Sequence, residues 1–227
     1  MNEEAYKAYL AGFHAPNKTN YWIESQKELE KIRNKYKGRK PRILIHVCCG
    51  PCAAWPLEFL SEHFDVTIFY NNSNIWPEAE YSKRLDTLRE LVDKACGNQM
   101  EIITTPYDNE TYNTYLAPHA DDPEGWERCF LCYRIRMDEA YAYAAEHGYD
   151  YFTTVMTISR QKNSQKLNEI GRELNVKYPS VSYFYSDFKK KGGQVRRDEL
   201  VCQYCLYCQD YCGCIYSYYQ RHPEQKP

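Results

Sequence analysis

The sequence has no run of apolar residues near the roughly 18 that a membrane-spanning helix requires. Its first residues, MNEEAYKAYLAGFHAP, are polar and acidic, unlike a secretory signal. We therefore expect a cytoplasmic protein without a membrane partner. The formal net charge is only −2, so any contact with nucleic acid must depend on a local basic patch.

Motifs of several common enzyme classes are also absent. The six histidines form no HExxH pair and no recognisable Ser-His-Asp arrangement, which leaves hydrolytic chemistry without support. The first predicted strand leads into CCGPC rather than into an SGGxDS-type phosphate loop, so ATP-driven sulfur transfer is disfavoured.

Cysteine is abundant: eleven occur among 227 residues. In a reducing compartment, clustered cysteines are typical of metal ligands or catalytic thiols rather than of structural disulfides. The odd count also excludes complete internal pairing. The 23 tyrosines are less informative, because tyrosine commonly packs at the edges of helices and cores.

Apolar runs of strand length alternate with helix-length segments along most of the chain. Residues 1–40 are predicted to be a helical extension and residues 41–222 a single α/β domain. We expect strands at 41–47, 65–72, 100–107, 150–157 and 181–188, and helices at 52–64, 76–97, 128–148 and 161–177. Residues 109–127 are predicted to be irregular. The alternation predicts a mostly parallel sheet covered by helices, followed by a helical Cys-rich tail, with sites at the carboxyl ends of the strands.

Three thiols fall within five residues at the predicted end of the first strand, in the motif CCGPC: Cys48, Cys49 and Cys52. Gly50 permits an unusual backbone angle, and Pro51 is typical of a helix start. At the N-terminus of a helix, the dipole and the free N–H groups favour thiolates, which can bind iron.

A second pair, Cys129 and Cys132, has Cys-x-x-Cys spacing at the start of a predicted helix, so both sulfurs can reach one metal. The most economical ligands for a [4Fe–4S] cluster are then Cys48, Cys49, Cys129 and Cys132. Cys52 could replace one of them, hold an additional mononuclear metal ion, or only pack.

Five more cysteines lie within thirteen residues near the C-terminus: Cys202, Cys205, Cys208, Cys212 and Cys214. A disulfide across Cys212-Gly213-Cys214 would close a small strained ring, and such a bond is easily cycled. This favours electron delivery by the pair. The alternative is a zinc-bound tail with CxxC and CxC ligands.

Polar and basic residues in two segments could contact an anionic substrate. The first segment follows the fourth predicted strand and enters a helix, and its candidates are Ser159, Arg160 and Lys162. The second, FKKKGGQVRR, is expected to be a flexible loop along a phosphate backbone, and its candidates are Lys189, Lys190, Arg196 and Arg197. Solvated surface charge is the alternative for both.

Taken together, HVCCGPC, FYNNSNIWPEAEYSKRL, ERCFLCYRIRM, TTVMTISRQKN, FKKKGG and YCQDYCGCIYS resemble the cobalamin-independent epoxyqueuosine reductase family, QueH. The resemblance covers roughly residues 42–217. It implies a Rossmann-like iron–sulfur enzyme that reduces epoxyqueuosine to queuosine at the tRNA wobble position. It also implies a [4Fe–4S] cluster on Cys48, Cys49, Cys129 and Cys132, a redox-active pair at Cys212 and Cys214, the anticodon loop as partner, and an external electron donor.

Two features depart from the family pattern. The usual Tyr-Arg-Gln before YCGC is Tyr-Cys-Gln at 207–209, and Cys202 and Cys205 lie just upstream. Either Arg196 or Arg197 then replaces the missing arginine, or the tail cysteines bind an additional metal.

One further class of function stays open at this point. A zinc-binding module, or an iron–sulfur electron carrier without catalysis, would use the same cysteines. Metal analysis separates the first of these from an iron–sulfur enzyme, because zinc without iron would favour the binding module.

Overall fold

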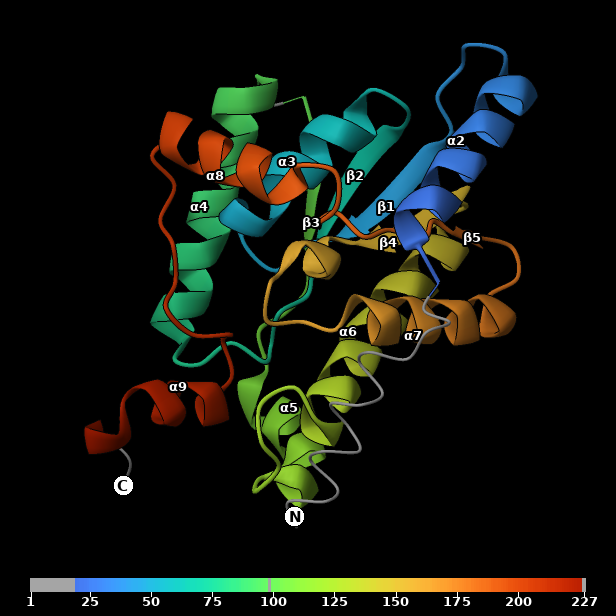
Figure 1. Ribbon diagram of the computed structural model, residues 1–227. Helices are drawn as coiled ribbons and strands as arrows, with labels where there is room; N and C mark the ends of the chain where they lie inside the picture. The colour runs from blue at the N-terminus through green and yellow to red at the C-terminus, as the bar shows by residue number, and fades with distance from the viewer. Residues whose placement is uncertain (1–18, 98, 226–227) are drawn as a thin grey trace.

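Five parallel strands form one sheet in the part of the chain that the structure, a computed structural model, describes: residues 19–97 and 99–225 (Figure 1). In the order β3-β2-β1-β4-β5, they are Ile102–Thr104, Asp65–Tyr70, Arg42–His46, Tyr151–Thr154 and Ser182–Tyr183. The helices are α2 (Tyr21–Tyr36), α3 (Gly50–Ser61), α4 (Glu78–Cys96), α5 (Asn109–Leu116), α6 (Glu127–Glu146), α7 (Ser164–Lys177), α8 (Gly193–Gln203) and α9 (Ile215–Arg221). Short 3-10 helices are η1 (Ala117–His119), η2 (Val155–Ile158) and η3 (Pro223–Gln225). The predicted Rossmann-like α/β fold is confirmed.

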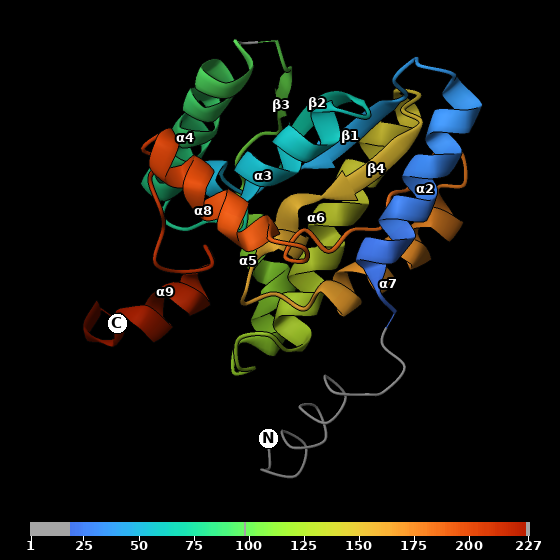
Figure 2. The same ribbon diagram turned by 45° about the horizontal axis from the view of Figure 1, so that its top comes forward.

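The sheet is covered on both faces, as Figures 1 and 2 show. Ile43 and Ile45 of β1 belong to a core shared with α2, α3, α4 and α8, whereas Leu44 belongs to a core shared with α6 and α7. Because both faces of β1 are buried, the strand is a continuous apolar run rather than an alternating one.

The chain leaves the central strand in two directions, with β2 and β3 on one side and β4 and β5 on the other. Strands β1 and β4 pair in parallel, with His46 opposite Thr154. Their carboxyl ends therefore meet at the point where the strand order reverses, which is where open α/β sheets place ligands. Residues 48–52 follow β1 at this edge, and residues 155–162 follow β4.

Capping side chains explain two differences in helix placement. The segment 109–127, predicted to be irregular, begins with α5, because Asp108 accepts a hydrogen bond from the backbone N–H of Thr111 (3.0 Å). Helix α7 begins three residues later than predicted, because the Asn163 side chain caps it. Residues 159–162 are consequently left as a loop.

The segment FKKKGGQVRR is not the flexible loop that the sequence predicts. Only its first half is a turn, and α8 begins at Gly193, after Gly192 in the left-handed region (φ 82°). A Cβ atom on Gly193 would lie 1.9 Å from the carbonyl oxygen of Phe188, so only glycine lets the helix start against this turn. Arg196 and Arg197 therefore project from a helix.

The Cys-rich tail is helical at its two ends. Cys202 lies in the last turn of α8, and the other four tail cysteines lie in the loop that connects α8 to α9. This loop passes along α4, where Lys94 Nζ donates to the carbonyl of Tyr204 (3.0 Å).

Helix α2 falls in the range predicted as an N-terminal extension. Its Leu29 and Ile32 join the core, and Tyr151 on β4 donates a hydrogen bond to Glu28 (2.9 Å). Residues 1–18 of the range lie outside the described residues. Among the described helices, none is long and apolar enough to cross a membrane.

Candidate active site

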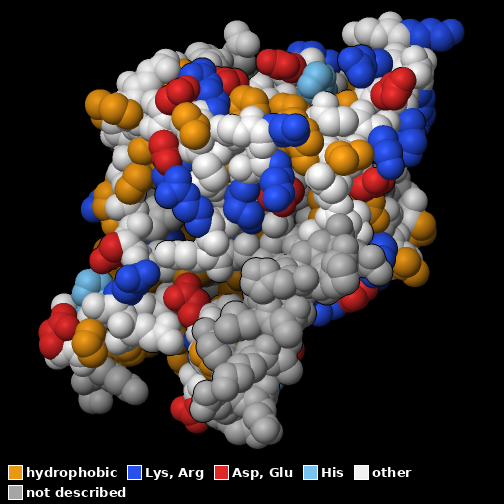
Figure 3. Space-filling model, viewed as in Figure 1, with side chains coloured by type: hydrophobic (Ala, Val, Ile, Leu, Met, Phe, Trp, Pro, Cys, Tyr) orange, Lys and Arg blue, Asp and Glu red, His pale blue; other side chains and the backbone are white. Residues whose placement is uncertain are grey.

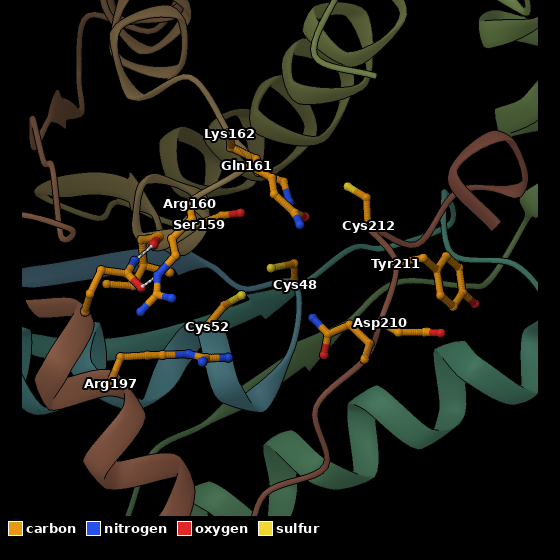
Figure 4. Close-up of a pocket in the computed structure, with 13 residues that line it drawn as sticks. Cys48, Cys52, Ser159, Arg160, Gln161, Lys162, Arg197, Asp210, Tyr211 and Cys212 are labelled. Carbon is orange, nitrogen blue, oxygen red and sulfur yellow. Dashed lines mark hydrogen bonds between the residues drawn. The ribbon is translucent and has the colours of Figure 1, made fainter. Parts of the chain in front are cut away.

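A pocket of about 180 Å³ lies at the carboxyl ends of β1 and β4 (Figure 4). Seven residues that the sequence predicted for the site line it: Cys48, Cys52, Ser159, Arg160, Lys162, Arg197 and Cys212. They come from the β1–α3 connection and the first turn of α3, the loop before α7, helix α8 and the tail. Four segments that are distant in the sequence therefore form one pocket.

The three sulfurs of CCGPC form a compact group. Their ligand atoms all lie within 4.8 Å of one another, and Cys48 Sγ is 3.9 Å from Cys49 Sγ. A Cβ on Gly50 would lie 2.8 Å from the carbonyl oxygen of Thr87, so glycine lets α3 pack closely on α4. The group can hold a metal ion through soft thiolate ligands.

One thiol of this group, that of Cys48, ionises more readily than the other two. Hydrogen bonds from Cys49 and Cys52 hold the pKa of Cys48 well below its usual value, and Lys162 adds to the effect. The interaction with Cys48 and burial in turn raise the pKa of Cys49 to about 12, and the pKa of Cys52 well above its usual value. Without a metal, Cys48 is therefore the thiol of the group that loses its proton most readily.

Lys162 places a positive charge in the pocket. Burial disfavours that charge, but the nearby Cys212, Tyr133 and Cys48 outweigh burial and raise the lysine's pKa well above its usual value. Figure 4 shows Lys162 and Cys212 reaching into the same space beside Cys48. An ammonium in this position stabilises thiolates and can donate hydrogen bonds to a substrate oxygen.

Two buried arginines add to the positive charge at the site, and neither was predicted from the sequence. Arg136, on α6, is 2% exposed, and its pKa is raised despite burial because Cys132 and Cys48 are close. It lies four residues after Cys132, and that i,i+4 spacing on a helix was the signal that could have identified it. Its Nε has no hydrogen-bond partner among the described residues.

Arg84, on α4, is the second buried arginine, with 1% exposure. It forms an ion pair with Glu80 (2.7 Å) and donates to the carbonyl oxygens of Cys212 (2.9 Å) and Tyr211 (3.3 Å). A Cβ on Gly213 would lie 3.1 Å from this guanidinium, and φ is +136° there. Arg84 therefore fixes the backbone of the tail beside the pocket.

The second cysteine pair lies next to the tail pair rather than inside the CCGPC group. Burial and the proximity of Cys212, Cys132 and Cys214 raise the pKa of Cys129 to about 12. Burial and Cys212 raise the pKa of Cys214 to about 11. The sulfurs that lie within 4.8 Å of one another are those of Cys48, Cys49 and Cys52, and the sulfurs of Cys129 and Cys132 are not among them. Arg136 lies close enough to Cys48, Cys132 and Cys212 for all three to raise its pKa.

The remaining predicted substrate residues lie outside the pocket lining. Lys189 Nζ donates to the carbonyl of Thr157 (3.0 Å) and to Ser164 Oγ (2.9 Å), so it holds the loop that carries Ser159 to Lys162. Arg196 forms a bidentate ion pair with Glu58 on α3. Lys190 is exposed near that loop.

Buried thiols surrounded by buried cations suit an anionic, thiolate-bound metal centre. Gln209 supports this view, because its Nε2 donates to Cys49 Sγ (3.0 Å) while its buried Oε1 has no partner among the described residues. The fold and the site together define an α/β enzyme with a thiol-rich centre.

Comparison with known proteins identifies the family. The model of the family described as epoxyqueuosine reductase QueH matches residues 43–220. The chain is 36% identical over 211 residues to an epoxyqueuosine reductase QueH from Streptococcus pyogenes serotype M1, covering 92% of this chain and 82% of that protein. It is 36% identical over 209 residues to one from Staphylococcus aureus strain Mu50, covering 89% and 87%. The chain belongs to the epoxyqueuosine reductase QueH family, and it is an oxidoreductase.

Among solved structures, the chain is similar to the U34-tRNA thiolase NcsA from Methanococcus maripaludis with its [4Fe–4S] cluster. The TM-score is 0.37 and the identity 11%, with 89% of this chain and 88% of that chain covered. A similarity this low does not bear on the site.

Proposed function

We propose that this chain reduces epoxyqueuosine in tRNA to queuosine at the wobble position, without cobalamin. The pocket at the carboxyl ends of β1 and β4 supports the proposal most, because the thiols of Cys48, Cys52 and Cys212 line it together with the ammonium of Lys162. The names of the relatives supply the substrate. Thiols beside a cation suit a reaction in which a carbon–oxygen bond breaks and an oxygen gains negative charge.

The cofactor we propose is a [4Fe–4S] cluster bound by Cys48, Cys49, Cys129 and Cys132. Such a cluster supplies an electrophile for the epoxide oxygen and a store of electrons. Burial of Arg84 and Arg136 beside these thiols supports an anionic group there. The position of the Cys52 sulfur supports a ligand role, either to the cluster or to an additional mononuclear metal ion.

In this proposal Lys162 hydrogen-bonds the epoxide oxygen and stabilises the charge that develops on it. Cys212 and Cys214 supply reducing equivalents: their two thiols become a disulfide and release two protons and two electrons. The epoxide takes up both electrons and both protons and yields an alkene and water. An external electron donor then reduces the disulfide.

The tRNA is proposed to lie across the face that carries α8, where Lys and Arg side chains gather (Figure 3). Arg160 and Arg197 line the pocket mouth, and Lys190 lies on the turn before α8. These residues contact phosphates, and Ser159 contacts the nucleoside. The wobble nucleoside leaves its base stack to enter the pocket.

The experiment is anaerobic purification, measurement of iron, sulfide and zinc, and incubation with epoxyqueuosine-containing tRNA and a reductant without cobalamin. Iron with sulfide and conversion of epoxyqueuosine to queuosine would support the proposal. Zinc alone without turnover would favour a binding module. Cys212→Ser should abolish multiple turnover, whereas Cys96→Ser, on α4 outside the pocket, should not.

A further inference from the structure

Four tail cysteines follow the spacing C-x2-C-x2-C-x3-C, at Cys202, Cys205, Cys208 and Cys212. This is the spacing of bacterial ferredoxins, in which the first three cysteines bind one [4Fe–4S] cluster and the fourth serves another centre. We propose that Cys202, Cys205 and Cys208 bind a second [4Fe–4S] cluster at the protein surface. Cys212, the fourth, lines the buried pocket, so it is not counted among the ligands of the surface cluster.

The three side chains are available for such a ligand. All three cysteines are exposed, in contrast to the buried Cys48, Cys49, Cys129, Cys132 and Cys214. Cys202 lies in the last turn of α8, and Cys205 lies in the turn that directly follows the helix. The Cys205 thiol already points back to the carbonyl of Cys202 (3.6 Å).

The backbone at Cys205 favours a residue other than cysteine. Its φ is +53°, in the left-handed region, and the turn is closed by hydrogen bonds from Cys205 N to Cys202 O (3.2 Å) and from Leu206 N to Val201 O (3.0 Å). Helix ends of this kind usually place glycine or asparagine at the left-handed position. A cysteine there carries a conformational cost of about 1 kcal/mol or more, which a ligand role explains.

One positive group contacts a thiol of this set, and two more contact the loop that carries it. Arg197 Nη2 lies 3.9 Å from Cys208 Sγ, and Lys94 Nζ binds the carbonyl of Tyr204 (3.0 Å). Lys83 Nζ lies 3.5 Å from the centre of the Tyr207 ring, in the same loop. Such cations favour the negative charge of a thiolate-bound cluster.

The proposed surface cluster adjoins the buried thiols. Gln209 follows Cys208 directly and donates to Cys49 Sγ (3.0 Å), and Arg197 joins Cys208 to the carbonyl of Pro51 (3.2 Å). A cluster at this position can take one electron at a time from a low-potential external donor and pass it inward. That role, unlike the binding of the cluster, rests on the proposed reductase function, which needs two such electrons for each epoxide.

The test is to reconstitute the full chain anaerobically with iron and sulfide, and to compare it with Cys202→Ser/Cys205→Ser. We expect about eight irons and eight sulfides per wild-type chain and about four fewer in the variant, since each cluster holds four of each. The dithionite-reduced EPR spectrum should lose one component. Cys96→Ser is the matched control and should keep all the iron. Circular dichroism should show that each variant folds.

Equal iron in the wild type and the double variant would overturn the proposal, and so would loss of zinc in place of iron. Cys49→Ser/Cys132→Ser tests the buried cluster separately. If that variant keeps all its iron while the tail variant loses it, the cofactor of the proposed function is refuted and the surface cluster stands. The reverse result refutes the surface cluster alone.

Discussion

The two groups of cysteines that meet at the pocket are held in different ways. Cys48 and Cys49 follow the central strand and enter α3, so sheet hydrogen bonds and two cores fix their backbone. Cys212 lies in a loop held by individual side-chain and backbone contacts, among them those from Arg84 and from Trp76 N to the carbonyl of Gly213 (2.8 Å). The strand-end thiols should therefore tolerate distant substitutions, whereas one side chain on α4 can release the tail.

Arg84→Met should have the largest effect, because it breaks the contacts that hold the tail. It removes the donors to the carbonyls of Cys212 and Tyr211 and leaves Glu80 buried without its cation. Breaking a buried ion pair in this way costs about 3–5 kcal/mol of unfolding free energy. We expect that loss in urea unfolding, and at least a ~10-fold fall in turnover, since misplacing a reacting group by about 1 Å can cost 100-fold.

Arg89→Met on the same helix is the matched control. Arg89 pairs with Asp86, but both side chains are largely exposed, at 59% and 64%. An exposed pair of this kind contributes about 0–1 kcal/mol. Equal losses in the two variants would show that Arg84 has no special role in holding the tail.

Two of the strand-end thiols, Cys48 and Cys52, should differ in reactivity. Cys48 and Cys52 both line the pocket, yet the pKa of Cys48 is lowered and that of Cys52 is raised. In metal-free, reduced protein at pH 7, iodoacetamide should modify Cys48 at least ~10-fold faster, because the thiolate is the nucleophile. Peptide mass spectrometry measures both rates.

The pH dependence of the Cys48 reaction tests the direction of its pKa shift. The rate at Cys48 should fall as the pH drops through its lowered pKa, and it should reach its plateau at a lower pH than the rate at an ordinary cysteine. Lys162→Met should raise that pKa and slow the reaction at pH 7, whereas Lys166→Met on α7 should not. Faster reaction at Cys52 than at Cys48 would contradict the assignment of the thiolate.

A smaller effect is expected at the pocket mouth. Arg160→Gln should weaken tRNA binding several-fold and reduce the slope of log affinity against log salt by about one, as for a lost phosphate contact. Arg196→Gln should change both less, because Arg196 lies outside the pocket lining, whereas Arg160, although it pairs with Asp198 (2.9 Å), lines the pocket. Filter binding at several salt concentrations compares them. A greater loss of tRNA affinity with Arg196→Gln would show that the tRNA does not lie along the pocket.

The sequence predicted those parts of the site that local pattern determines. The apolar run before CCGPC indicated a buried strand, and the rule for strand carboxyl ends placed Cys48 and Lys162 on the same edge, as the pocket confirms. The glycines in FKKKGGQVRR were interpreted as signs of a loop. In the structure Gly193 allows a close helix start, which depends on the position of Phe188 and not on local propensity.

Buried cations were the main omission. Arg84 lies in a helix of largely charged sequence, where an arginine usually faces solvent. Its burial depends on the tail loop folding over α4, a contact between residues 128 positions apart that no local pattern indicates. The capping by Asp108 and Asn163 was readable from sequence, since aspartate and asparagine are favoured at helix N-caps.

Cys205→Gly should have the smallest effect and the opposite sign to the others. Glycine relieves the left-handed strain at φ +53°, about 1–2 kcal/mol, and adds about 0.4–1 kcal/mol of unfolded-state entropy. Urea unfolding of metal-free, reduced protein should therefore show a gain of about 0.5–1 kcal/mol. Cys202→Gly, also exposed but helical, should instead lose about 0.3 kcal/mol, the difference in helix propensity between the two residues. A loss in both variants would mean that the turn at Cys205 is not strained, and would remove the conformational argument for a ligand there.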